Sequence, residues 1–335
     1  MTTPLDPFIA GPLIKEIGRG KKGARGMARA DSHALYAAML DGRVSDLELG
    51  AIVLALRFKG ESVDEIAGFL DAAEASFAPL AAPAGPYAPV LIPSYNGARK
   101  LANLTPLLAL LLAREGVPVL VHGVTTDPGR VTTAEIFAAM AMPAVTDSAG
   151  VAAAFAAAFD ANKPAFMPIE LLAPKMARLL DLRSILKLRN STHTLVKILQ
   201  PFAEPALRLV SYTHPEYLEM LGEYFQTAAA PARGHAFLMR GTEGETVANA
   251  NRANQIDWFH DGQRTLLVQR DAPTDDLAQM PEARDATTTA AWIAQALRGE
   301  VPVPASITEQ VAQCLLVSKT LRANTGGNDH GAQQR

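Results

Sequence analysis

The spacing of apolar and polar positions separates a helical first part of the chain from a mixed second part. Within residues 8–76, apolar side chains recur at intervals of three and four, which predicts a series of amphipathic helices. The clearest pattern is SDLELGAIVLALRFKG, for which Ser45 is the expected N-cap and Gly60 the expected stop. From residue 90 onward, short apolar runs alternate with helical patterns. This βαβ rhythm predicts an α/β unit with a central, mostly parallel sheet and helices on both faces.

A proline-rich segment marks the boundary between the two parts. It reads APLAAPAGPYAP and is broken too often by proline to form a helix or a strand. We therefore expect an N-terminal helical domain at residues 1–80 and an α/β domain from residue 88 onward. Residues 324–335 are expected to form a flexible tail. Within the α/β domain, strands are expected at VLIP, VPVLVHG, PAFMP, ALRLVSY, HAFLMRG and RTLLVQR.

Composition narrows the class of protein without defining a function. The chain has 335 residues, of which 49% are hydrophobic, and its formal net charge is −3. Attraction to nucleic acid would therefore have to come from local clusters of cations. The single cysteine, Cys314, excludes an internal disulfide, and no charged-then-apolar leader opens the chain, so we expect a cytoplasmic protein. The longest apolar run, residues 104–113, is about half a bilayer span, so no membrane association is expected. Too few Cys and His residues stand at ligand spacing to predict a metal site.

The segment LIPSYNGARK, residues 91–100, occupies the position of a phosphate-binding loop. It follows an apolar strand and precedes a predicted helix, where main-chain amides can approach an anion. It keeps only one glycine, Gly97, and it ends in two cations, Arg99 and Lys100. The loop therefore combines the position of a phosphate site with an unusual, cation-rich sequence.

The order of elements resembles the glycosyltransferase family 3 fold, best known from anthranilate phosphoribosyltransferase (TrpD). The resemblance rests on GRVSDLELGAIVLALRFKGES, PSYNGARK, VHGVTTDPGRVTTAEIFAAM and LKLRNSTHTLVKILQP, and it covers nearly the whole chain. It implies a small all-helical domain on a larger α/β domain of the nucleoside phosphorylase/phosphoribosyltransferase type. It further implies that a helical insertion at about 168–200 completes the helical domain, which leaves 88–167 and 201–323 for the α/β domain. A homodimer through the N-terminal helices is also implied.

Against that family, the catalytic motifs of this chain are degenerate. The family's glycine-rich diphosphate turn is replaced by PSYN, and Val121 stands where the family has a lysine. The family's acidic pair, which holds Mg²⁺ on the diphosphate, falls on Thr246 and Val247, with two glutamates, Glu243 and Glu245, beside it. The resemblance thus implies a vestigial phosphoribosyl-diphosphate cleft formed by Tyr95, Asn96, Gly97, His122, Thr132 and Glu243.

A third family motif is altered in the same direction. In RNSTHTLVKILQP, Arg189 survives, while His193 replaces an asparagine and Lys197 replaces a proline. Groups suited to Mg-diphosphate chemistry are lost and permanent cations are gained. This pattern, and the YNGARK form of the loop above all, resembles the YbiB-type branch of TrpD-like proteins. That resemblance implies nucleic-acid binding in place of catalysis, with no catalytic residue and no cofactor.

Two clusters of cations support this interpretation from the residues themselves. Residues 170–208 hold seven cations against three acids, and KEIGRGKKGARGMAR, residues 15–29, holds six against one. Thirteen cations exceed what one nucleotide can use, whereas a run of phosphates can engage them and release counterions. We expect sequence-independent binding of DNA or RNA, with Tyr95 as a stacking platform. The predicted nucleic-acid-binding residues are Lys187, Arg189, Lys197, Arg183, Lys21, Lys22, Arg25, Arg99 and Lys100.

Two other functions remain open from the sequence. One is a Mg²⁺-dependent phosphoribosyltransferase with an unidentified acceptor, acting through the cleft. The other is a structural or regulatory partner protein without either activity. The cations can also be read as an ordinary solvated surface, and His122 and His193 as structural residues. The enzyme hypothesis would use Asn96, Lys100, His122, Thr132 and Glu243.

Overall fold

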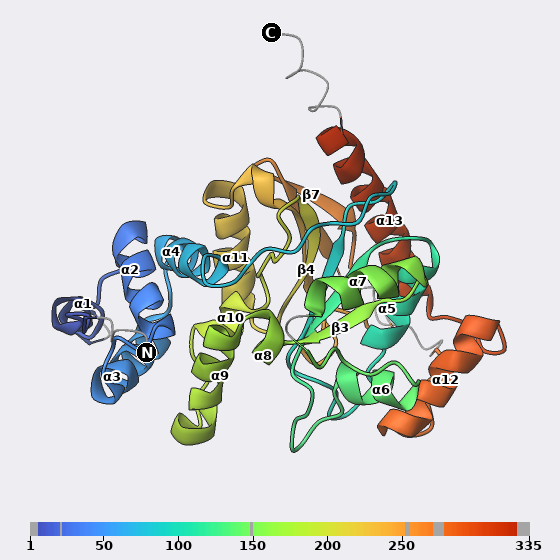
Figure 1. Cartoon of the computed structure of the whole chain (residues 1–335), viewed down its shortest axis with the longest axis horizontal. Coiled ribbons are helices and arrows are strands. Elements are labelled where there is room, and N and C mark those ends of the chain that lie inside the picture. The colour runs from blue at the N-terminus through green and yellow to red at the C-terminus, as the bar shows by residue number, and fades with distance from the viewer. Residues whose placement is uncertain (1–5, 21, 148–149, 252–254, 271–277, 327–335) are drawn as a thin grey trace, which may run out of the picture.

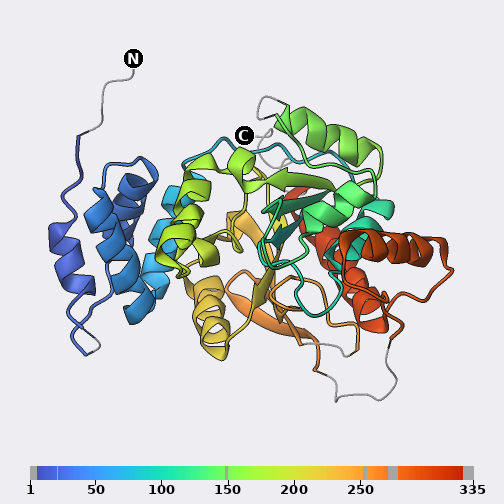
Figure 2. The same ribbon diagram turned by 90° about the horizontal axis from the view of Figure 1, so that it is seen from below.

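The molecule has a lobe of helices at one end and a sheet covered by helices at the other (Figures 1 and 2). The lobe begins with four helices, α1 (Gly11–Ile17), α2 (Arg29–Leu40), α3 (Asp46–Lys59) and α4 (Val63–Glu74), in which α2 packs on α4 and α1 on α3. The structure is a computed structural model, and it describes residues 6–20, 22–147, 150–251, 255–270 and 278–326.

Local sequence sets the ends of α3 as predicted. The Ser45 side chain accepts a hydrogen bond from the Glu48 amide, and the Glu48 carboxylate accepts one from the Ser45 amide, which completes a capping box. The helix ends at Gly60, whose φ of 79° suits glycine. Helix α4 begins with the same box, formed by Ser62 and Glu65. The predicted start and stop of α3 are therefore confirmed.

The second part contains a single seven-stranded sheet among the described residues, in the order β3-β2-β1-β4-β5-β6-β7. The first five strands of that order run parallel, and β6 and β7 are antiparallel to their neighbours. All six predicted strands are present. The seventh, β6, escaped prediction because its sequence, IDWFH, mixes polar and apolar residues in a short run. The strands are β1 (Val90–Ser94), β2 (Val119–Gly123), β3 (Ala165–Pro168), β4 (Ala206–Tyr212), β5 (Gly234–Arg240), β6 (Ile256–His260) and β7 (Gln263–Val268).

The sheet separates two hydrophobic cores. In β1, Leu91 packs into one core, while Val90 and Ile92 pack into the other, as alternation along a strand requires. The core behind Val90 and Ile92 is closed by α5 (Thr105–Arg114), α6 (Thr133–Ala139), α12 (Ala286–Arg298) and α13 (Ala305–Gly326). The core that contains Leu91 also takes side chains from α7 (Val151–Asp160), from α11 (Pro215–Thr227) and from the helical lobe. A short 3₁₀ helix (Pro231–Arg233) precedes β5.

The helical insertion predicted after β3 consists of three helices. They are α8 (Ile169–Leu172), α9 (Pro174–Leu186) and α10 (Thr192–Leu195). Helix α9 contacts α2, and α10 contacts α4, so this segment packs against the N-terminal helices. Helix α9 ends because Lys187 takes the left-handed conformation, with φ 58°. Lys187 is therefore the C-cap of α9 and lies outside its regular turns.

The C-terminal helix is longer than the sequence pattern predicts. Helix α13 continues to Gly326, past the expected start of the tail at residue 324, and residues 327–335 lie outside the described part of the chain. Cys314 is buried in this helix. Of the helices that the structure describes, none combines the length and the apolar character needed to cross a membrane.

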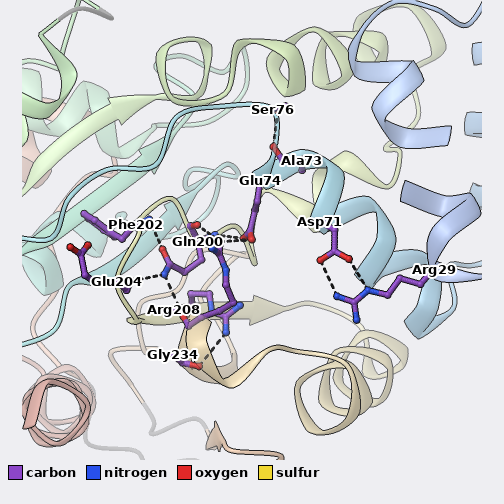
Figure 3. Close-up of polar contacts among 11 residues, drawn as sticks. Arg29, Asp71, Ala73, Glu74, Ser76, Gln200, Phe202, Glu204, Arg208 and Gly234 are labelled. Carbon is purple, nitrogen blue, oxygen red and sulfur yellow. Dashed lines mark hydrogen bonds and ion pairs between the residues drawn. The ribbon is translucent and has the colours of Figure 1, made fainter. Parts of the chain in front are cut away.

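A polar junction ties the helical lobe to the sheet (Figure 3). Glu74, at the end of α4, accepts a hydrogen bond of 2.9 Å from the Gln200 amide and forms an ion pair with Arg233. Arg208 on β4 lies beneath this junction; it is 2% exposed and donates to the Gly234 carbonyl at 3.4 Å. The Glu74 carboxylate thus lies near the guanidinium groups of Arg233 and Arg208, so the charge balance of the junction depends on it.

Candidate functional site

The loop after β1 has a tightly fixed backbone. Gly97 has φ 64°, and a Cβ there would lie 2.8 Å from the Val131 carbonyl oxygen, so only glycine fits without strain. Ala98 exchanges main-chain hydrogen bonds with Val131. The Arg130 guanidinium donates to the Gly97 carbonyl at 3.2 Å. The loop is therefore held against the chain that follows β2.

Two glutamates from the chain after β5 accept the amide protons of this loop. Glu245, which is 1% exposed, accepts from the amides of Asn96 and Gly97 at 2.8 and 2.6 Å through a single oxygen, Oε1. Glu243 accepts from the amides of Arg99 and Lys100 at 2.6 and 3.0 Å. Four main-chain donors of the loop are thus paired with carboxylates of the protein itself.

The charge state of Glu243 follows from its surroundings. Partial burial opposes ionisation, but hydrogen bonds from the amides of Lys100, Arg99 and Leu101 outweigh it and hold the pKa of Glu243 below its ordinary value. The positive charge of Arg130 acts in the same direction. The Glu243 carboxylate is therefore ionised at neutral pH.

The Gly244 carbonyl lies between the two glutamates and accepts hydrogen bonds from three side chains. The donors are Asn96 Nδ2 at 2.7 Å, Ser211 Oγ at 2.7 Å and Lys197 Nζ at 3.3 Å. Gly244 has φ 93°, and a Cβ there would lie 2.1 Å from Asn96 Nδ2. These contacts fix the 243–245 segment to the loop, to β4 and to the chain after α10.

A cleft with a volume of about 300 Å³ opens between the helical lobe and the end of β4. Arg57 and Glu61 line it from the lobe, and residues 211–217 line it from the other side. Arg189 and Lys197 complete its wall; the Arg189 guanidinium donates to Asn96 Oδ1 at 2.8 Å and so links the cleft to the loop.

The cations of the cleft lie close enough to repel one another. Burial lowers the pKa of Lys197 to about 8, with Arg189 and Arg130 adding to the effect and Glu245 opposing it. Burial also lowers the pKa of Arg189, and the charges of Arg183 and Arg130 lower it further. Burial lowers the pKa of His193 to about 4, and the charges of Arg189 and Arg183 add to this effect, so the imidazole is neutral at pH 7. Three cations, Arg57, Arg189 and Lys197, thus line the cleft together with two glutamates, Glu61 and Glu216.

The structure places the predicted cations at different depths. Lys187, Arg183, Arg99 and Lys100 are exposed, whereas Arg189 and Lys197 are partly buried in the cleft wall. Lys197 was predicted as a phosphate anchor in a further helix, but it follows the one-turn helix α10 and donates into the protein. Lys197 is therefore less accessible than a side chain that contacts phosphates at the protein surface.

Several cations counted in the two clusters are neutralised or buried. Arg208 is enclosed under the sheet, because β4 is a central strand. Lys175 forms an ion pair with Asp41 at 2.7 Å, and Arg178 donates to the Leu40 carbonyl. In the N-terminal cluster, ion pairs engage Arg19 with Glu16 and Arg29 with Asp71. The sequence-based count of thirteen free cations is therefore too high.

The rest of the N-terminal cluster lies on α1, which carries the exposed Lys15, and on the loop that follows it. Lys22 and Arg25 are exposed there, and Lys21 lies outside the described residues. The loop approaches the α3–α4 turn, since the Met27 amide donates to the Glu65 carboxylate at 3.1 Å. That turn also carries Glu61, which lines the cleft.

Tyr95, which is partly buried, pairs with the buried His122. The Tyr95 hydroxyl lies 2.8 Å from His122 Nδ1, and the two rings meet edge to face. Burial lowers the pKa of His122 to about 3, so the ring that shares this hydrogen bond is neutral at pH 7. Tyr95 packs against the hydrophobic core. Both residues therefore support the loop, and the role of Tyr95 in base stacking stays a prediction.

Thr132 has a structural role as well. It is the N-cap of α6, where its side chain accepts from the Glu135 amide and donates to the Thr125 carbonyl at 2.8 Å. Its neighbour Thr133 bonds to Ser94 and Asn103. The Thr132 hydroxyl is thus already engaged by the protein.

The residues at the loop do not fit a magnesium site. The oxygens nearest the loop, on Glu243 and Glu245, accept main-chain hydrogen bonds. No group of three or more His, Cys, Asp or Glu residues that could hold a metal ion occurs in the described part of the chain. The positions of the family's acidic pair are Thr246 and Val247, which are both buried and offer no carboxylate. We therefore derive no chemical step through Mg²⁺.

Sequence reasoning missed two cations and the role of the glutamates. Arg130 stands in a TDPGR turn, and Arg57 in the last turn of α3, so neither belongs to a charge cluster in the sequence. Glu243 and Glu245 were noted only beside the family's acidic pair, with Glu243 also assigned to the vestigial cleft. Their partners lie more than 140 residues away in the chain, and no local pattern reports such a contact.

Comparisons with known proteins agree with the architecture. Residues 12–76 match the family model "Glycosyl transferase family, helical bundle domain". A protein of Escherichia coli (strain K12), named Uncharacterized protein YbiB, is 46% identical over 308 residues, which span 91% of this chain and 93% of that protein. The anthranilate phosphoribosyltransferase of Beijerinckia indica is 25% identical over 299 residues, spanning 86% of this chain and 81% of the enzyme.

Two solved structures share the fold. Anthranilate phosphoribosyltransferase (TrpD) from Thermus thermophilus superposes with a TM-score of 0.68 at 20% identity, covering 93% of this chain and 89% of the enzyme. The Saccharomyces cerevisiae enzyme in complex with PRPP and Mg gives a TM-score of 0.67 at 13% identity, covering 92% and 88%.

A helical lobe on an α/β body, with a loop of main-chain donors at the end of β1, defines a phosphoribosyltransferase-like protein. Within that class, the chain belongs to the TrpD-like proteins of glycosyltransferase family 3, and YbiB of Escherichia coli is among its relatives.

Proposed function

We propose that this TrpD-like protein binds nucleic acid without sequence specificity, through the cations at the mouth of the cleft. The observation that carries the proposal is a group of five cations gathered at this cleft and beside it. None of the five forms an ion pair within the described residues. They come from α3, the turn after β2, α9 and the chain that follows α9. The five are Arg57, Arg130, Arg183, Arg189 and Lys197.

Exposed cations on neighbouring segments extend this positive surface. Lys187 ends α9 beside Arg189, and Arg99 and Lys100 stand on the loop that Arg189 contacts through Asn96. On the other side, the loop that carries Lys22 and Arg25 meets the α3–α4 turn, whose residues line the cleft. A chain of phosphates is a better match for such a spread of charge than one small anion.

The salt dependence of binding tests the proposal. Fluorescence anisotropy with a labelled random 20-mer, single- or double-stranded, should give an affinity that falls steeply as salt rises. About four to six phosphate contacts predict a log–log slope between about −3 and −5, at roughly −0.7 to −0.9 per contact. A slope near zero, or no binding at low salt, would contradict the proposal. Micromolar binding of phosphoribosyl diphosphate with Mg²⁺ in its place would favour the transferase.

We also propose that the protein is a homodimer through its N-terminal helices. Leu47 and Phe58 on α3 are 86% and 80% exposed, and Ile9 before α1 is 80% exposed. Leu47 and Phe58 are eleven residues apart, about three turns, so they lie on the same face of α3. Large apolar side chains gathered on an exposed face support a protein interface.

Charged substitutions on that face test the dimer. Leu47→Asp/Phe58→Asp should convert the dimer to a monomer in sedimentation velocity, because burying two carboxylates in an interface is costly. Leu266→Asp is the matched control, since Leu266 is 53% exposed on the distant strand β7. A double variant that sediments like the unaltered protein would remove this face from the interface.

A further inference from the structure

The loop after β1 already contains an anion, supplied by the protein. We propose that Glu243 and Glu245 act as a built-in occupant of an anion-binding loop and exclude inorganic phosphate and diphosphate groups from it. This inference is independent of nucleic-acid binding, because it concerns the main-chain donors of residues 96–100 and not the cation side chains of the cleft.

The geometry of the donors carries the inference. Four amides within five residues, those of Asn96, Gly97, Arg99 and Lys100, donate to carboxylate oxygens at 2.6 to 3.0 Å. Successive amides that converge in this way form a concave donor site suited to an anion. A phosphate that entered the loop would need the same protons, because each amide has only one.

Electrostatics strengthens the exclusion. A phosphate oxygen that entered the loop would also be repelled by a retained carboxylate, because the two like charges would lie at contact distance in a partly buried site. Glu245 cannot swing aside easily, since it is 1% exposed and follows Gly244, whose carbonyl accepts three hydrogen bonds. Its second oxygen, Oε2, has no hydrogen-bond partner, although the ammonium of Lys197 is near enough to attract it.

The two glutamates divide the loop into halves that can be tested separately. Glu245 holds the amides of residues 96 and 97 from a buried position, whereas Glu243 holds those of residues 99 and 100 and is partly exposed. Removing Glu243 therefore frees two donors without opening the core. Removing both glutamates frees all four.

The test combines hydrogen exchange with a probe anion. In Glu243→Ala, amide exchange at residues 99–100 should accelerate while exchange at 96–97 stays slow. Sodium pyrophosphate should then restore protection at 99–100, and calorimetry should give at least about tenfold tighter pyrophosphate binding than in the unaltered protein, a change of about 1.4 kcal/mol. Glu115→Ala is the control, because it removes the same charge from an exposed site at the end of α5.

A second variant keeps the test decisive. Glu243→Ala/Glu245→Ala should extend the pyrophosphate-dependent protection to residues 96–97; if this variant does not fold, the single variant still decides the question. Pyrophosphate that protects residues 96–100 of the unaltered protein would overturn the inference. So would a folded Glu243→Ala protein whose exchange and pyrophosphate affinity match those of the control. Oligonucleotide affinity of the unaltered protein bears only on the proposed function.

Discussion

Reversing two charges at the end of α9, in Arg183→Glu/Lys187→Glu, is expected to weaken oligonucleotide binding about 100-fold at 100 mM salt, or about 2.7 kcal/mol. Each substitution removes an attraction to phosphate and adds a repulsion beside Arg189. Both side chains are exposed, so the fold should survive. Anisotropy across a salt series measures the loss, and the log–log slope should become less negative by about 1.5 to 2.

Two control variants test whether the loss of affinity comes from the charges at this site. One distinguishes it from a change in net charge, and the other from a change in stability. Lys163→Glu/Lys319→Glu makes the same charge change at exposed sites near the ends of α7 and α13, and should alter affinity much less. Lys187→Gly removes one charge at a position with φ 58°, which glycine adopts without strain. It should maintain or raise the melting temperature and still weaken binding. Equal losses in both double variants would contradict the proposed site.

Removing the carboxylate of Glu74 should lower the free energy of unfolding by about 3–5 kcal/mol, because Arg233 and the buried Arg208 would lose their nearest negative charge. Burial raises the pKa of Glu74 above its ordinary value despite the opposing charge of Arg233. The ion pair therefore does not fully offset the desolvation cost of Glu74. The expected loss of stability comes from leaving the charges of Arg233 and Arg208 without this carboxylate. Urea denaturation of Glu74→Ala measures it.

The same helix supplies the comparison. Asp71 on α4 forms a bidentate pair with Arg29 at 2.7 and 2.9 Å, also drawn in Figure 3, but both side chains are more than two-fifths exposed. Asp71→Ala should therefore cost only about 0–1 kcal/mol. If the two substitutions cost the same, the junction at Glu74 does not depend on charge balance.

Sequence reasoning located what is coded locally. The caps of α3, the six predicted strands and the helical lobe all follow from patterns within about twenty residues, and the structure contains them. Strand β6 was missed because five residues with Asp257 and His260 carry no clear alternation. The end of α9 was not predicted, because the left-handed residue there is Lys187 and not a glycine or an asparagine.

The candidate site was harder to predict because charge depends on distant partners. The sequence shows Lys175 and Asp41 in separate segments, and only the fold brings them within 2.7 Å. In the sequence Arg208 counts as one more cation of the cluster, but β4 lies in the middle of the sheet, and the side chain is buried there. Lys197 and Arg189 were predicted to bind nucleic acid and line the cleft, whereas two other cations nearby, Arg57 and Arg130, were not predicted at all.

The core that contains Leu91 runs without interruption from α2 and α4, through α9 and α10, to one face of the sheet. The two sides of the cleft are therefore parts of one packed body, and this packing opposes a hinge motion that would close the cleft around a ligand. Any partner must adapt to a surface whose shape is set in advance. The loss of conformational freedom on binding then falls on the partner, which favours a pliable strand over a stiff one.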